Sequence, residues 1–581
     1  MKDFLKYLLA TVVGVILSSF VLFLILVGIL SAVVSMQDKP AEIKDNSVLY
    51  IKLDEPVSDR KPALPIFNVK ALGLNDILES INKAKEDDRI KGIYLEPTVI
   101  PAGMATVEEI RNAILDFKES GKFVICHSDF YTQPSYYLAT AADKIYMNPE
   151  GYFPLVGYRA QLMFFKGTLE KLGVKAEIIR HGKFKSAVEP LMYDKMSDEN
   201  REQLSTIIGS MWDHVTEEIA SRRGLTKERI NFIADNLLVW DAQSALEYKL
   251  IDSISYKDHV LDRLKELAGV EKSKKIQLIS LLKYTKVPAS RKHKTFAKNK
   301  VAVIYASGNI QLGNEGEGTI SSERISKAIR DARSDSSIKA IVMRVNSGGG
   351  DATASEVIYR ELCLAREVKP VIASFGDVAA SGGYYIAVPA DTIVASQGTI
   401  TGSIGVWGVV LNLKDFLNNK LGITMDVEKT NRYSDLYSGY RTLAPREREV
   451  LQHHMDRIYN TFVSHVSENR KMSYEDVDKI GEGRVWSGIN AKENGLVDVY
   501  GGLSTAVELA AAKANLDKYR VVDLPRLEEP IEQLMKELAG EIRVSILKRE
   551  LGNSFQYYDF LQEAMNLNGI QARMPFDIEI Y

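Results

Sequence analysis

Short apolar segments alternate with segments of helical periodicity along most of the chain after residue 45. In the second half these apolar runs are nearly continuous, as expected for strands that are covered on both faces. The pattern predicts strands at Val301–Tyr305, Ala340–Val345, Val371–Phe375 and Thr392–Ala395. Helices are predicted between them at Arg324–Arg333 and Ala354–Arg366. Strands that alternate with helices indicate an α/β domain with a largely parallel sheet.

The first half repeats this pattern, which indicates a duplicated domain. KGIYLEP begins at Lys91 and matches KAIVMRVNS, which begins at Lys339, so the offset is 339 − 91 = 248. The offset changes little further on, because Asp252 matches Asp498 with 498 − 252 = 246. Solenoid repeats are far shorter than this. Strands in the first copy are predicted at Val48–Leu53, Gly92–Leu95, Phe123–Cys126 and Lys144–Met147.

The repeat and its flanks predict the domain boundaries. The first repeat covers residues 45–270 and the second covers 300–525, with a basic linker at 271–300 between them. A helical tail is expected at 526–581.

The N-terminal 40 residues have a different character. Leu8 to Met36 carry no charge, and this run exceeds the roughly 20 residues that cross a bilayer. Lys2 and Lys6 precede the run, so the positive-inside rule places the N-terminus in the cytoplasm and the rest of the chain outside. A cleaved signal peptide has a shorter apolar core, of about 7–15 residues, and Ser31-Ala-Val is only a weak cleavage site. We therefore predict a retained transmembrane anchor within residues 1–40.

Composition narrows the functional classes. The 581 residues are 45% hydrophobic and 26% charged, which is typical of globular proteins. The 74 basic and 77 acidic residues nearly cancel, which argues against a dedicated nucleic-acid binder. The two cysteines, Cys126 and Cys363, lie in apolar stretches and fit a protein core better than a metal site. No cluster has metal-ligand spacing, so neither a metal nor a cofactor is expected.

Three motifs in the second repeat carry candidate chemistry. Asn346–Asp351, NSGGGD, follows a strand, and its backbone N–H groups could hold a phosphate or an oxyanion; a tight strand-to-helix turn is the alternative. The Lys-Ser/Thr pair of a P-loop is missing there. Asp377–Tyr385 places the single hydroxyl of Ser381 among small residues, either as a nucleophile or as a packing turn. Thr399–Gly405 is a polar strip that either supports a site or holds strand-edge hydroxyls.

A nucleophilic serine needs a base. None of the eight histidines lies between Asn346 and Gly408, and His453 and His454 lie on a charged helical stretch that favours a surface position. The alternative is a lysine whose pKa is lowered by burial.

The repeat supports a lysine base. Ser381 corresponds to Gln133 at the offset of 248, so the first copy lacks the serine. Lys185 in GKFKSAVEP corresponds to Ser434 at an offset of 249, so the second copy lacks the lysine. This complementarity predicts one site that is divided between two degenerate halves.

These motifs resemble the signal peptide peptidase A family in its long, duplicated form. The resemblance rests on KSAVEP (Lys185–Pro190), RVNSGGGDATASE (Arg344–Glu356), DVAASGGYYIA (Asp377–Ala387) and TGSIGVWG (Thr401–Gly408). It implies tandem Clp-protease/crotonase-like domains and a membrane-anchored serine protease. Such an enzyme would degrade cleaved signal peptides with a Ser–Lys dyad.

The resemblance also implies roles for individual residues. It makes Ser381 the nucleophile, Lys185 the general base, Gly350 and Gly382 the oxyanion donors, and Ser403 the residue that orients the lysine. The chain has Gly348 where the family usually has proline, which loosens this turn.

A location and an assembly are implied as well. We expect a homotetramer on the bacterial inner membrane, with periplasmic catalytic domains that act on apolar peptides and no nucleic-acid partner. A crotonase-like acyl-CoA enzyme and a non-enzymatic membrane scaffold are the alternatives. The sequence leaves open whether Lys185 and Ser381 meet within one chain or between two.

Overall fold

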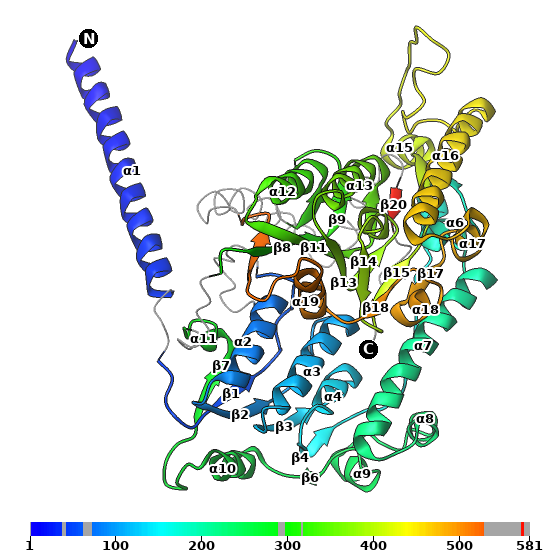
Figure 1. Ribbon diagram of the computed structural model, residues 1–581. Helices are drawn as coiled ribbons and strands as arrows, with labels where there is room; N and C mark the ends of the chain where they lie inside the picture. Colours follow the sequence, from blue (N-terminus) through cyan, green and yellow to red (C-terminus); the bar gives the residue numbers. More distant parts are fainter. Residues whose placement is uncertain are drawn as a thin grey trace.

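The computed structural model describes residues 2–37, 42–61, 72–288, 297–314, 316, 318–527 and 571–573. Figure 1 shows two α/β units side by side, with the helix α1 (Lys2–Gln37) standing apart from both. Within these described ranges, no helix is found that is long and apolar enough to span a bilayer. The transmembrane anchor that the sequence predicts within residues 1–40 is therefore not shown by the structure.

A sheet of six parallel strands forms the first unit. Its strand order is β6-β4-β3-β2-β1-β7. The strands are β1 (Ser47–Ile51), β2 (Ile90–Leu95), β3 (Phe123–Phe130), β4 (Lys144–Tyr152), β6 (Ser253–Ile254) and β7 (Gln277–Ser280). The helices of this unit are α2 (Leu74–Glu86), α3 (Met104–Lys118), α4 (Gln133–Ala139), α5 (Lys166–Leu172), α6 (Glu189–Met192), α7 (Asp198–Arg223), α8 (Lys227–Asp235), α9 (Ala242–Glu247), α10 (Lys257–Ala268) and α11 (Leu281–Tyr284), with a 3₁₀ turn at Ser186–Val188.

Part of the predicted linker belongs to this first unit. β7 pairs in parallel with β1, and α11 follows it directly. Ile279 and Leu281 are buried in the core of the first unit. The apolar residues of this stretch therefore extend the sheet, although its many lysines resemble those of a solvated linker. Residues 289–296 lie outside the described part.

The second unit is built on an eight-stranded sheet. Its main path is β17-β15-β13-β11-β8-β19, with β14 beside β13 and β18 beside β14. The strands are β8 (Lys300–Ser307), β11 (Ile338–Ser347), β13 (Val371–Ala380), β14 (Thr392–Ala395), β15 (Ile400–Gly402), β17 (Val485–Ser487), β18 (Val499–Tyr500) and β19 (Arg520–Leu524). The helices are α12 (Ser322–Ser334), α13 (Ala352–Arg366), α14 (Gly382–Ala387), α15 (Lys414–Leu421), α16 (Pro445–Arg470), α17 (Tyr474–Ile480), α18 (Gly488–Glu493) and α19 (Leu503–Lys513).

A third sheet joins the two units. Its order is β10-β9-β12-β20-β16-β5. The strands are β5 (Lys175–Arg180), β9 (Asn309–Gln311), β10 (Thr319–Ser321), β12 (Gly349–Asp351), β16 (Trp407–Asn412) and β20 (Gln571–Arg573). β5 comes from the first repeat and pairs antiparallel with β16 of the second. This pairing brings the chain that follows β5, including Lys185, against the second repeat.

The structure confirms a duplicated α/β architecture. Each strand predicted from the apolar runs has a counterpart, most often a longer one; for example, the predicted Val371–Phe375 lies within β13. One difference concerns NSGGGD, where a strand-to-helix turn is an alternative from the sequence. Gly349–Asp351 instead forms β12, because its backbone pairs with β9 and β20. The predicted helical tail after residue 527 lies outside the described residues, apart from β20.

Candidate active site

Ser381 lies at the junction of β13 and α14. Its φ is 54° and its ψ is −117°, an uncommon backbone conformation that costs on the order of 1–3 kcal/mol for a residue with a side chain. The N–H of Ser381 donates to the carbonyl of Gly402 at 2.8 Å, which fixes this sharp turn against β15. Small neighbours allow the turn: a Cβ on Gly383 would lie 2.6 Å from the carbonyl oxygen of Ser347.

Lys185 reaches Ser381 from the first repeat, within the same chain. Its Nζ lies 2.9 Å from Ser381 Oγ, 2.9 Å from Ser403 Oγ and 3.1 Å from the Ser403 carbonyl oxygen. The side chains of Lys185, Ser381 and Ser403 are all fully buried. Burial alone lowers the pKa of Lys185 well below its ordinary value, because the charged ammonium loses its hydration.

The contacts of Lys185 suit a neutral amine. A neutral amine has two N–H donors and one lone pair. If the two donors bind the Oγ and the carbonyl oxygen of Ser403, the lone pair points to the third contact, Ser381 Oγ. The arrangement can therefore accept a proton from the serine hydroxyl. Ser381 Oγ also lies 3.3 Å from the carbonyl oxygen of Gly405.

The turn that precedes β17 contacts both Ser403 and Lys185. Ser403 has a φ of 53°, and its N–H donates to the carbonyl of Arg484 at 2.6 Å. Gly483 lies directly against the lysine: a Cβ there would be 2.6 Å from Lys185 Cβ and 2.8 Å from its Cδ. Gly405 also borders the lysine stem, with Lys185 Cδ 3.3 Å from where its Cβ would be. No sequence motif or repeat counterpart marks Gly483, so its place beside the lysine is visible only in the structure.

The loop that carries Lys185 is fixed by polar contacts between the KSAVEP motif and the start of α7. Glu189 is fully buried, and it accepts hydrogen bonds from Ser197 Oγ at 2.5 Å and Asn200 Nδ2 at 2.8 Å. Gln203 Nε2 donates to Ser186 Oγ at 2.9 Å. These contacts tie the turn after Lys185 to the first two turns of α7, so the lysine is presented by a rigid element.

The two predicted oxyanion donors lie on β12 and α14. A Cβ on Gly350 would be 2.1 Å from the carbonyl oxygen of Ile310, so only glycine fits between β12 and β9. Gly382 is the first residue of α14, where N–H groups have no partner within the helix. The contact between Gly383 and Ser347 brings the start of α14 against the glycine-rich segment. The start of α14, which carries Gly382, therefore lies next to Ser381 and against the glycine-rich segment.

The corresponding place in the first repeat holds no such dyad. Gln133 replaces the serine, and its Oε1 accepts from the N–H groups of Val156 and Gly157 at 3.0 and 2.7 Å. Its Nε2 donates to the Gly157 carbonyl at 2.9 Å. Ser434, the counterpart of Lys185, is exposed and donates to the carbonyl of Asn431. The amide of Gln133 therefore fills the first-repeat site.

The other candidate groups lie elsewhere. His453 is exposed on α16, and His454 on the same helix contacts Arg457. Among the residues that the structure describes, no three or more His, Cys, Asp or Glu side chains are grouped so that they could hold a metal ion. Cys126 and Cys363 are free thiols.

Comparison with known proteins gives one family model and several relatives that are named proteases. Residues 116–271 and 364–517 match the model of Peptidase family S49. The chain is 35% identical over 539 residues to the serine protease SPPA, chloroplastic, of Arabidopsis thaliana, covering 92% of this chain and 78% of the relative. It is 35% identical over 520 residues to Protease 4 of Salmonella typhi, covering 88% of this chain and 82% of the relative.

A solved structure was also matched. A mutant of ClpP1 from Listeria monocytogenes is 16% identical, with the match covering 35% of this chain and 94% of that chain and a TM-score of 0.24. A match with this TM-score does not establish a shared fold, so the Clp-protease/crotonase-like fold stays a prediction.

Proposed function

Because the chain belongs to peptidase family S49 and is a serine protease, we propose that it hydrolyses peptide bonds with a Ser381–Lys185 dyad. The observation that carries the proposal is the 2.9 Å contact between Lys185 Nζ and Ser381 Oγ, both fully buried. Burial lowers the pKa of Lys185 well below its ordinary value, which favours the neutral amine that a general base requires.

The proposed reaction proceeds through an acyl-enzyme. Neutral Lys185 takes the proton of Ser381 Oγ as this oxygen attacks the peptide carbonyl. The resulting ammonium donates a proton to the leaving amine as the peptide bond breaks. Lys185 then takes a proton from a water molecule that attacks the acyl-enzyme, and the acid product leaves Ser381 with its proton restored.

The negative charge of the tetrahedral intermediate is assigned to backbone donors. The N–H groups of Gly350 and Gly382 would bind the oxyanion, each from a rigid element. Loss of a single oxyanion donor typically costs about 10²–10³-fold in kcat. Ser403 keeps the lysine amine aimed at Ser381 through its Oγ and carbonyl oxygen.

Apolar peptides in extended form are the proposed substrates, with cleaved signal peptides as the biological class. β12 pairs with β9 on one side and with the antiparallel strand β20 on the other. An extended peptide that took the place of β20 would form the same backbone hydrogen bonds regardless of its side chains. Ile310 of β9 pairs with Gly350 of β12, and Trp407 of β16 pairs with Gln571 of β20, so the strands beside β12 and β20 carry large apolar residues, which are buried here.

Hydrolysis of an apolar fluorogenic peptide by the full chain tests the dyad. Wild type, Ser381→Ala and Lys185→Ala are compared with Lys183→Ala, which removes an exposed lysine two residues away. We expect both dyad variants to lose activity and fluorophosphonate labelling, and Lys183→Ala to keep both. Full activity in folded Lys185→Ala would refute the lysine base.

The proposed location is the bacterial inner membrane, with the N-terminus cytoplasmic and the catalytic repeats periplasmic. This part rests on the charge-free run from Leu8 to Met36 in the sequence. Alkaline carbonate extraction of cell membranes tests the location, because an integral anchor keeps the protein in the pellet.

The proposed homotetramer is tested by light scattering, which should give four times the subunit mass. A monomer would contradict it.

A further inference from the structure

A β-bulge interrupts β13 just before Ser381. Phe375 pairs with Val345 of β11, and the next pair joins Ala379 with Ser347. Three residues of β13, Gly376 to Val378, therefore lie opposite the single residue Asn346. Bulges of this kind bend a strand and redirect the side chains that follow. Here only Ala379 and Ala380 separate the bulge from Ser381.

Two side chains of the second repeat hold the backbone of this bulge. Asn346 Oδ1 accepts from the N–H of Val378 at 3.1 Å. Thr399 Oγ1 donates to the carbonyl of Gly376 at 2.9 Å. Two main-chain groups of the bulge, the N–H of Val378 and the carbonyl of Gly376, are thus paired within the second repeat.

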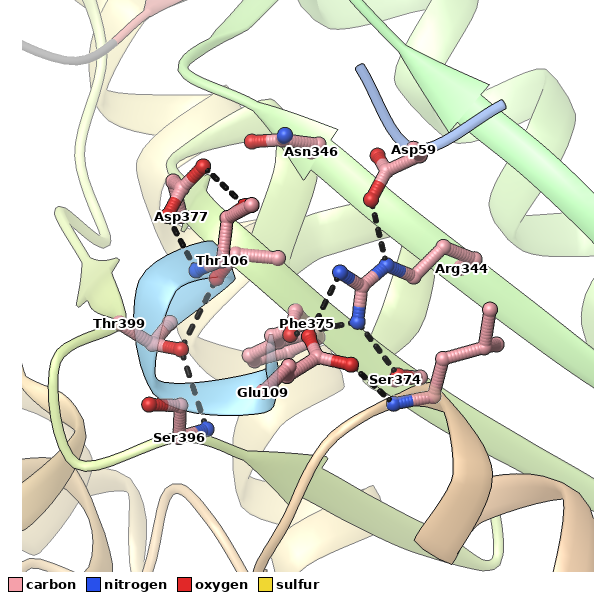
Figure 2. Close-up of polar contacts among 12 residues, drawn as sticks. Asp59, Thr106, Glu109, Arg344, Asn346, Ser374, Phe375, Asp377, Ser396 and Thr399 are labelled. Atoms are coloured by element: carbon pink, nitrogen blue, oxygen red, sulfur yellow. Dashed lines mark hydrogen bonds and ion pairs between the residues drawn. The ribbon is translucent and has the colours of Figure 1, made fainter. Parts of the chain in front are cut away.

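The side chain of the middle bulge residue, Asp377, crosses to the first repeat. Its Oδ1 accepts from the N–H of Thr106 at 2.9 Å and its Oδ2 accepts from Thr106 Oγ1 at 2.7 Å (Figure 2). Thr106 is the third residue of α3, where a carboxylate satisfies a free N–H and meets the positive end of the helix. Gly103 permits this approach, because a Cβ there would lie 2.3 Å from Asp377 Cγ.

α3 is itself anchored to the second repeat. Glu109 accepts from Arg344 at 2.7 Å and from the N–H of Leu503 at 2.7 Å, and Arg344 also contacts Asp59 at 2.8 Å (Figure 2). Arg344 is fully buried, and Glu109 and Asp59 are nearly so. These buried contacts fix α3 relative to the second repeat, so the bond from Thr106 to Asp377 also fixes the position of the bulge.

We propose that Asp377 is a positioning residue for the nucleophile: through Thr106 of the first repeat it fixes the bulge of β13 and thereby the backbone turn at Ser381. The equivalent residue of the first repeat supports this assignment. Asp129 lies 248 positions earlier, next to a similar register shift in β3, but it is exposed and contacts Asn148. The turn that follows Asp129 carries Gln133 at the position of the nucleophile.

The test measures peptide hydrolysis and the rate of fluorophosphonate labelling for the full chain and its variants. Asp377→Ala should lower kcat and the labelling rate together by about 10²-fold, the cost of misplacing a reacting group by about an ångström. The KM should change less than threefold. Asp377→Asn should stay within about fivefold of wild type, since an amide can keep both contacts with Thr106. Asp129→Ala is the matched control and should leave kcat unchanged.

Thr106→Val serves as the second variant, because it removes only the hydroxyl contact and keeps the fold. We expect kcat to fall roughly three- to tenfold, and the double variant with Asp377→Ala to be no worse than Asp377→Ala alone. Unchanged kcat in Thr106→Val and Asp377→Ala would overturn the positioning role. So would additive losses, or losses that match the unfolded fraction seen by circular dichroism.

The inference rests on Ser381 as the nucleophile, and the two can be tested apart. If Ser381→Ala kept its activity, the proposed function would fail whatever the Asp377 variants did. If Ser381→Ala were inactive while Asp377→Ala labelled at the wild-type rate, only the positioning role would fail.

Discussion

Replacing Gly483 by alanine should disable Lys185 while leaving the fold intact. The new Cβ would lie 2.6 Å from Lys185 Cβ, 2.7 Å from its Cα and 2.8 Å from its Cδ. Carbon atoms in van der Waals contact lie about 3.5–4.0 Å apart, so the lysine must move by about 1 Å. Nζ now lies 2.9 Å from Ser381 Oγ, and a displacement of this size would break that contact.

The expected loss is about 10²-fold in kcat, or about 2.7 kcal/mol of transition-state stabilisation. A second cost falls on stability, because Gly483 has a φ of 83° and alanine in this region costs about 1–2 kcal/mol. Initial rates with a fluorogenic peptide and a denaturant unfolding curve measure the two effects separately.

Gly495→Ala is the matched control for this experiment. Gly495 has a φ of 78°, close to that of Gly483, but the atom nearest to where its Cβ would lie is Met472 Sδ, at 3.7 Å. It should therefore show the same loss of stability with no loss of kcat. If Gly483→Ala kept more than half of the wild-type kcat, or if both variants lost activity equally, the contact with Lys185 would not be what sets the rate.

Three further predictions concern buried charge. The kcat/KM should rise with pH through the lowered pKa of Lys185, because only the neutral amine accepts a proton; an acid limb near the ordinary lysine pKa of about 10.4 would contradict this. Unfolding lets Lys185 regain a proton, so the stability of wild type relative to Lys185→Met should rise with pH up to about 10.4, and denaturant curves that showed a pH-independent difference would refute it. Arg344→Met should cost about 3–5 kcal/mol in denaturant unfolding, because Asp59 and Glu109 would be left buried without a cation; a change below about 1 kcal/mol would argue against that ion-pair cluster as a link between the repeats.

The strands and helices were largely predictable because each depends on local periodicity. The apolar runs around Val371 and Ala340 are continuous in sequence, and β13 and β11 contain them. The strand β13 extends past Phe375 to Ala380, which the pattern did not indicate, because Gly376 and Asp377 interrupt the apolar run. They lie in a bulge whose backbone is paired by residues distant in sequence.

The candidate site was predictable in part. Comparison of the two repeats directed attention to Ser381 and Lys185 as complementary residues, and the structure places them 2.9 Å apart within one chain, although they are separated by 196 positions. Gly483 and Thr106 could not be found in the same way. Each acts only through an atom of another segment, and nothing in its own neighbourhood marks that contact.

The sequence by itself determined the duplicated α/β pattern and the types of residue available for catalysis, because periodicity and composition are properties of short segments. Only the tertiary structure decided how the halves combine. The antiparallel pairing of β5 with β16 carries Lys185 to the second repeat, and the contact of Thr106 with Asp377 ties the nucleophile strand to the first. Such contacts join segments that are far apart along the chain, and their geometry depends on how complete sheets and helices pack against each other.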